Sequence, residues 1–280
     1  MISEFINDLL TYGFLQKALF TGVIVGILCG VIGCFIVLRG LALMGDAISH
    51  AVLPGVAISY MLGINFFYGA VVVGLMAAFG IGFINRNSMI KNDSAIGIVF
   101  STFFAVGAIL VAKAQTATDL TEILFGNVLT VQDSDRLMTV IVTVIVLVLV
   151  LLFYKELELS SFDPTMAQAA GIPVKFIHYM LMIMLTLVTV VSLQTVGVIL
   201  VVALLITPAS TAYLLTNRLS HMIFVSAVLG AVAAVIGIFV SFKYNLASGP
   251  VIVLVISVFF ILAFLLAPRR GIVWKIIGGR

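Results

Sequence analysis

The chain has 280 residues, of which 63% are hydrophobic and only 9% are charged, and its formal net charge is +3. So few polar residues cannot cover a water-soluble globule of this size, and the sequence has no basic stripe for nucleic acid. The composition therefore predicts an integral membrane protein. Its apolar runs reach about 20 residues, which suits helices that cross a bilayer.

Nine apolar segments predict an all-α fold, a polytopic membrane helical bundle of about eight or nine spans, in one transmembrane domain over residues 1–280. The segments are 14–38, 47–63, 66–85, 94–112, 137–154, 176–193, 196–215, 222–242 and 250–267. The short segment 47–63 contains Pro54 and Gly55, and Pro208 interrupts 196–215. Either segment could be a broken or partial span, so eight crossings plus a re-entrant piece stay open as an alternative.

Lysine and arginine residues predict the orientation of the bundle, because cytoplasmic loops carry an excess of them. One end has Arg39, Arg86, Lys91, Lys155, Lys175, Arg218, Arg269, Arg270, Lys275 and Arg280. The other end has Lys17, Lys113, Arg136 and Lys243. We therefore expect an external N-terminus and a cytoplasmic C-terminus.

Two connections are longer than a simple turn. The external one, from Lys113 to Asp135, is acidic and carries Asp119, Glu122 and Asp133 as well. It is either a solvated loop or a rim that attracts cations or a basic partner.

The cytoplasmic connection, residues 155–173, predicts a short helix near 162–171. Asp163 suits the N-cap, Pro164 suits the first helical position, and Gly171 with Pro173 ends the helix. A helix with two defined ends and small residues favours docking of another protein. The alternative is an ordinary interfacial helix that fills space under the bundle.

Asp46 and His50 form the most informative pair in the sequence. They are four residues apart within an apolar stretch, so a helix places both on one face. A carboxylate at the centre of a membrane helix costs about 2.5 to 3.5 kcal/mol on insertion scales, so Asp46 needs a cation, a proton or a donor.

Three interpretations of this pair stay open. In the first, its oxygen and nitrogen form a transient site for a divalent metal such as Mn²⁺, Fe²⁺ or Zn²⁺, and a symmetric dimer doubles the ligands to four. In the second, the pair relays protons in a secondary transporter. In the third, the two side chains only bond to each other in a structural scaffold.

The remaining chemistry-bearing residues are interpreted more simply. Cys29 and Cys34 are expected to be small core residues, and His178 and His221 to lie at the membrane interface. No Gly-x-x-x-x-Gly-Lys-[Ser/Thr] motif occurs, so any ATP that drives transport must be hydrolysed by a partner subunit. No acid–base or nucleophile arrangement suggests that the chain is an enzyme.

The stretch 37–57, VLRGLALMGDAISHAVLPGVA, resembles the signature of the metal-ion permease family of ABC importers. Residues 194–213 resemble a second stretch of that family, and 162–171 lie where its members carry the helix that docks onto the ATPase. The similarity covers essentially the whole chain. It is strongest to the manganese permeases of Gram-positive bacteria.

The resemblance implies a fold like that of the vitamin B12 importers, with fewer helices, in a bacterial cell membrane. It implies a permease homodimer, two cytoplasmic ATP-binding subunits and an extracytoplasmic protein that delivers Mn²⁺, Zn²⁺ or Fe²⁺, with no permanently bound cofactor. Asp46 and His50 would line the path of the metal. The residues that would couple to the ATPase are Asp163, Pro164, Ala167, Ala169 and Gly171.

Overall fold

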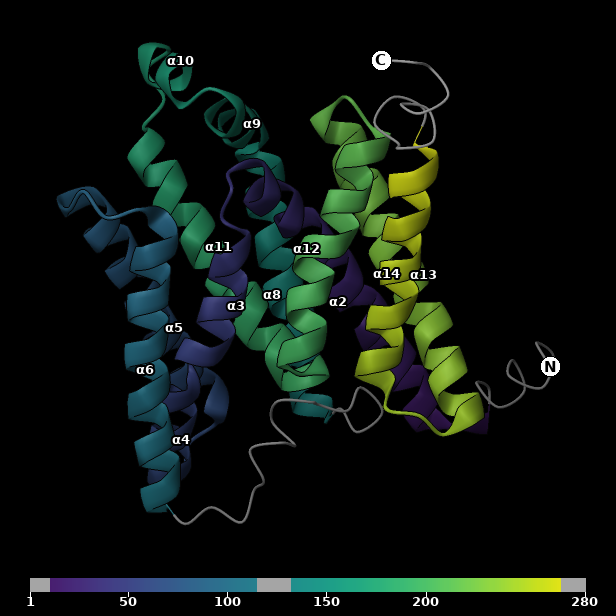
Figure 1. Cartoon of the computed structure of the whole chain (residues 1–280). Helices are drawn as coiled ribbons and strands as arrows, with labels where there is room; N and C mark the ends of the chain where they lie inside the picture. Colours follow the sequence, from purple (N-terminus) through teal and green to yellow (C-terminus); the bar gives the residue numbers. More distant parts are fainter. Residues whose placement is uncertain (1–10, 115–131, 268–280) are drawn as a thin grey trace.

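The computed structural model describes residues 11–114 and 132–267, and every regular element in these ranges is a helix (Figure 1). The helices are α2 (Gly13–Leu38), α3 (Ala42–Ala51), α4 (Leu53–Leu62), α5 (Phe66–Asn87), α6 (Asn92–Ala114), α8 (Asp133–Leu152), α9 (Tyr154–Phe162), α10 (Pro164–Ala169), α11 (Val174–Val196), α12 (Val198–Leu215), α13 (Leu219–Tyr244) and α14 (Ser248–Leu266). The predicted all-α class is confirmed.

Nine spans in the described ranges are long and apolar enough to cross a membrane, and each corresponds to one predicted segment. The chain is therefore a multi-pass membrane protein. Successive spans run in alternate directions, so α2 begins at the lower end of Figure 1 and α14 finishes at the upper end, where α10 also lies.

The second span is the only one of the nine that is divided between two helices, α3 and α4. The division falls at Val52, because Pro54 has no N–H to donate to the carbonyl of His50 four residues earlier. The two helices follow each other in one direction and together make 21 residues, Ala42–Leu62. The broken span is thus confirmed, and its 21 residues are long enough for a full crossing. Pro208, in contrast, lies inside the uninterrupted helix α12.

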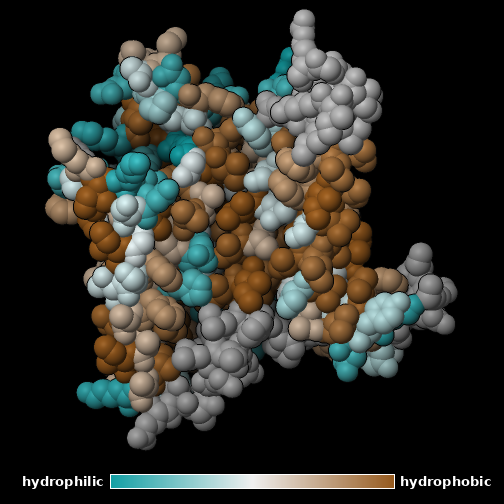
Figure 2. Space-filling model, in the orientation of Figure 1, coloured by the Kyte–Doolittle hydropathy of each residue, from teal (hydrophilic) through white to brown (hydrophobic). Residues whose placement is uncertain are grey.

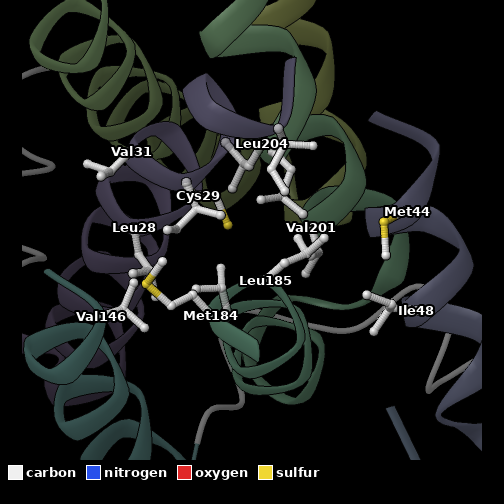
Figure 3. Packing of buried hydrophobic residues seen from close by; sticks show 14 of the residues in the cluster. Leu28, Cys29, Val31, Met44, Ile48, Val146, Met184, Leu185, Val201 and Leu204 are labelled. Atoms are coloured by element: carbon white, nitrogen blue, oxygen red, sulfur yellow. The ribbon is translucent and has the colours of Figure 1, made fainter. Parts of the chain in front are cut away.

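The centre of the core is formed by α2, α11 and α12. Figure 3 shows Leu28 and Cys29 of α2 near Met184 and Leu185 of α11 and near Val201 of α12, all of them buried. Because lipid is as apolar as these side chains, close packing holds such helices together.

Glycines bring α2 close to the helices beside it. A Cβ atom at Gly26 would lie 2.6 Å from the carbonyl oxygen of Gly230 on α13, and one at Gly33 would collide with the carbonyl of Leu205 on α12. Small residues of the first span thus permit close contact between helices.

Both cysteines are buried free thiols, as predicted for small core residues. The Cys29 Sγ atom lies 3.7 Å from the Ser192 hydroxyl, and the Cys34 thiol donates to the carbonyl of Gly30 at 3.2 Å.

The connection between α8 and α11 contains two short helices instead of one. α10 has the predicted ends: the Asp163 carboxylate accepts from the Met166 N–H at 2.9 Å, Pro164 begins the helix, and Gly171 has a φ of +82°. α9 was not predicted as a separate element. Phe162, assigned from the sequence to the docking helix, is the last residue of α9.

Some predictions concern residues outside the described ranges. They include Asp119 and Glu122 of the acidic connection and Arg269 and Arg270 of the tail. Asp133 is described: Lys17 Nζ donates to its carboxylate at 2.9 Å, and Arg136 lies 3.3 Å away.

Candidate functional site

Helix α3 has two unlike faces. Met44 and Ile48 are fully buried, and Figure 3 shows both side chains directed at the core formed with α11 and α12. Gly45 lies on the same side, where a Cβ atom would meet Leu205 of α12 at 3.0 Å. The opposite face carries Asp46 and His50, so packing of the apolar face against the core directs this pair away from it.

The structure brings the Asp46 and His50 side chains together. The Nε2 atom of His50 lies 3.6 Å from a carboxylate oxygen of Asp46, which is too long for a hydrogen bond. The Asp46 side chain is 49% exposed and that of His50 is 24% exposed. An oxygen and a nitrogen, both partly exposed, therefore lie close enough to approach one small ion together.

The pair lies in the first half of the second span. Asp46 is the fifth residue and His50 the ninth of Ala42–Leu62, which places them about 6 Å and about 12 Å along the helix axis from Ala42. In Figure 2 hydrophilic atoms lie over α3 within a mainly hydrophobic surface. A half-exposed carboxylate at such a depth needs a water-filled path or a protein partner.

Two aromatic rings of α6 hold the imidazole of His50. Its ring centroid is 5.5 Å from that of Phe100 and 5.8 Å from that of Phe104, and both contacts are edge-to-face. The two phenyl rings stack on each other at 5.9 Å. The sequence analysis missed this contribution, although an aromatic pair at i and i+4 in α6 was the available signal.

Among the described residues, the Asp46–His50 pair offers two candidate ligands in one copy of the chain. Within residues 11–114 and 132–267 no group of three or more His, Cys, Asp and Glu side chains could hold a metal ion. His178 and His221 lie near the first residues of α11 and α13, at the end of the bundle that carries α10. They do not join the pair.

Helix α10 is a second candidate region, at the end of the bundle. Asp163, Pro164, Ala169 and Gly171 are exposed, and so is the apolar side chain of Met166. Ala167 is fully buried, so it anchors α10 and offers no surface to a partner. The helix thus presents a mixed surface to its surroundings, with Met166 and Ala169 beside the polar Thr165 and Gln168.

The whole chain is similar to proteins of known family. The model of the ABC 3 transport family matches residues 11–267. The manganese transport system membrane protein MntC of Listeria monocytogenes is 63% identical over 271 residues, which cover 97% of both chains. The manganese import system permease protein ScaB of Streptococcus parasanguinis is 54% identical over 270 residues, which cover 96% of both.

A solved structure agrees with this similarity. A chain of PsaBC from Streptococcus pneumoniae, in complex with a Fab, superimposes with a TM-score of 0.90 at 52% identity and covers 99% of this chain and 100% of its own. The superposition over the whole chain and the family match therefore agree. This chain belongs to the ABC 3 transport family.

Proposed function

We propose that this chain is the membrane-spanning subunit of an ATP-driven importer that moves Mn²⁺ into the bacterial cytoplasm. The family match and the manganese transport named for its relatives support this function. The observation that carries it is the half-exposed Asp46–His50 pair at membrane depth. A single transmembrane domain over residues 1–280 would form the subunit.

The metal is cargo in this proposal, and the chain holds no permanent cofactor. Asp46 supplies a carboxylate oxygen and His50 an imidazole nitrogen, a ligand pair that suits Mn²⁺ and also admits Fe²⁺ and Zn²⁺. Two ligands bind weakly enough to release the ion. In a homodimer with the open faces of α3 turned to a shared path, the ligands would number four.

The proposed importer needs two kinds of partner protein. Since the sequence has no phosphate-binding loop, two cytoplasmic ATP-binding subunits would hydrolyse ATP. An extracytoplasmic binding protein would deliver the metal. The end of the bundle with α10 would face the cytoplasm, because Arg39, Lys91, Lys155 and Arg218 lie there.

The other two interpretations of the pair have less support. A proton-driven transporter is not favoured by membership of an ABC transport family. A scaffold whose Asp and His only bond to each other requires a hydrogen bond, and the 3.6 Å contact is too long for one.

ATP-dependent uptake of Mn²⁺ into liposomes tests the proposal. The liposomes would contain this chain with its ATP-binding subunit, and the delivery protein would be added outside. We expect Asp46→Asn to lower uptake at least about tenfold, because the amide has no charge to offer the cation. Asp93→Asn, at an exposed residue of α6, is the matched control.

Full uptake by an assembled Asp46→Asn complex would contradict the site. Uptake that needs a proton gradient but no ATP would instead establish the secondary transporter.

Docking of the ATP-binding subunit on α10 is tested separately. Ala169→Arg places a long charged side chain on the exposed surface of this helix, so we expect loss of co-purification and of transport-coupled ATP turnover. Ala169→Ser keeps the side chain small and should behave like the wild type. Normal co-purification and normal turnover of Ala169→Arg would show that α10 is not the contact.

A further inference from the structure

Arg39 occupies the junction between α2 and the site helix α3. Its backbone N–H bonds to the carbonyl of Phe35 at 3.1 Å, and the next residue, Gly40, has a φ of +65°. The N–H of Gly40 then bonds to Val37 and that of Leu41 to Ile36, at 3.2 and 2.9 Å. This closed turn ends α2 and fixes the direction in which α3 begins.

The side chain of Arg39 reaches across to the last turn of α9. Its Nε atom donates to the Ser161 hydroxyl at 3.0 Å, and its Nη2 atom donates to the Ser160 hydroxyl at 2.6 Å. Both hydroxyls donate onward to the carbonyl of Leu157, at 2.6 and 3.3 Å. The planar fork of arginine suits two neighbouring acceptors, which a lysine ammonium could not span in the same way.

Arg39 carries a positive charge, and removing part of its water costs free energy, so the contact stabilises the fold less than its hydrogen bonds suggest. Burial lowers the pKa of the guanidinium to about 10, so it still carries its charge at neutral pH. Within the described part of the chain no carboxylate forms an ion pair with it. Two hydroxyl dipoles replace part of the water that this partly buried charge loses, and such a charge is weak evidence of a purely stabilising role.

The contact leads directly to α10. The N–H of Asp163 bonds to the carbonyl of Leu159 in α9, and the Asp163 side chain caps α10. Only Phe162 separates Ser161 from this cap. Hydrogen bonds, together with the short run of chain from Ser161 to Asp163, therefore connect α10, the last turn of α9, Arg39 and the turn before α3.

We propose that Arg39 is a positioning residue that transmits displacement of the α9–α10 segment to α3, and so links ATP turnover to opening and closing of the Asp46–His50 site. The inference rests on the proposed function. A shift of α9 pulls on both hydroxyl contacts at once, and the rigid turn at Gly40 passes the shift to the first residues of α3. Asp46 follows Arg39 by seven residues.

The test is the number of Mn²⁺ ions transported per ATP hydrolysed by the complete complex in liposomes. Ser160→Ala/Ser161→Ala removes both acceptors and leaves Arg39 in place. We expect ATP turnover to stay within about twofold of the wild type and the metal-to-ATP ratio to fall about tenfold, within the usual range of coupling between sites. Arg39→Lys, which keeps the charge, should give an intermediate ratio, and Ser160→Thr/Ser161→Thr should restore it.

Two controls isolate the contact. Arg218→Met removes an exposed arginine at the same end of the bundle, and Ser257→Ala removes a hydroxyl that bonds only to the Val253 carbonyl of its own helix. Both should keep the wild-type ratio. If the double alanine variant does not assemble, the single variants Ser160→Ala and Ser161→Ala take its place. Each keeps one acceptor for Arg39, so the metal-to-ATP ratio of each should fall, but by less than about tenfold.

An unchanged metal-to-ATP ratio in the Ser→Ala variants would overturn the inference. So would a parallel fall of uptake and ATP turnover in them, because that result indicates a structural role only. Failure of the proposed function is distinguishable, because the wild-type complex would then show no ATP-dependent uptake at all.

Discussion

Where α2 passes α13, glycines bring two backbones into contact, whereas at the contact of α3 with α6 aromatic rings surround a polar side chain. Gly26 lies against Gly230 in the first contact, and the Ser226 hydroxyl of α13 donates to the carbonyl of Gly30 at 2.8 Å. In the second, Phe100 and Phe104 face the imidazole of His50. In lipid, close backbone contact gives a rigid frame, because helices there gain most from tight packing.

The two contacts have different roles: the α2–α13 contact belongs to the rigid frame of the bundle, and the α3–α6 contact belongs to the candidate site. At Gly26 and Gly230 the α2–α13 contact leaves no room for a Cβ atom, and the Ser226 hydroxyl bonds across it to Gly30. The α3–α6 contact orients His50 by its ring edges and leaves the Asp46 carboxylate half exposed. We therefore expect substitutions in the first region to change stability and those in the second to change metal handling.

Gly26→Val should have the largest effect. The new Cβ atom would meet the backbone of Gly230 at 2.6 Å, and backbone cannot move aside as a side chain can. Overpacking of this kind costs about 1–3 kcal/mol or more, so the melting temperature of the purified protein should fall. Gly13→Val, in the same helix with nothing within 4 Å, is the control. Equal melting temperatures of the two variants would refute the rigid frame.

Phe104→Leu should have a smaller and different effect. Losing one edge contact of about 0.5–1.5 kcal/mol frees the imidazole of His50, so KM for Mn²⁺ uptake should rise about two- to tenfold. The melting temperature should hardly change, because Phe104 is 40% exposed. Phe264→Leu breaks a comparable phenyl stack with Phe260 in α14, and its KM should match the wild type. A wild-type KM for Phe104→Leu would show that the Phe104 ring does not contribute to the site.

The sequence predicted the spans well because a bilayer imposes a length on them. The segment predicted at 66–85 matches the span Phe66–Asn85, and 14–38 matches Gly13–Leu38 within a residue. The second span begins five residues earlier than predicted, at Ala42, because Gly45 and Asp46 lower the local hydropathy. The ends of α10 followed from local chemistry, through the cap at Asp163 and the positive φ of Gly171.

What the sequence did not predict depends on contacts between distant segments. No separate helix was predicted before residue 162, where Lys155, Glu156 and Glu158 make the stretch polar, yet α9 forms there and buries Leu157. The spacing of Asp46 and His50 placed them on one face of a helix. It gave no indication that α6 would supply the rings against His50, since that contact is set by tertiary packing.

The central claim, that Asp46 and His50 bind the metal, is tested most directly by pulsed electron paramagnetic resonance of Mn²⁺ bound to the complex without its delivery protein. With ¹⁵N-labelled histidine in this chain alone, we expect a hyperfine coupling from an imidazole nitrogen. It should disappear in His50→Gln and persist in His178→Gln and His221→Gln. A coupling that survives in His50→Gln would contradict the site.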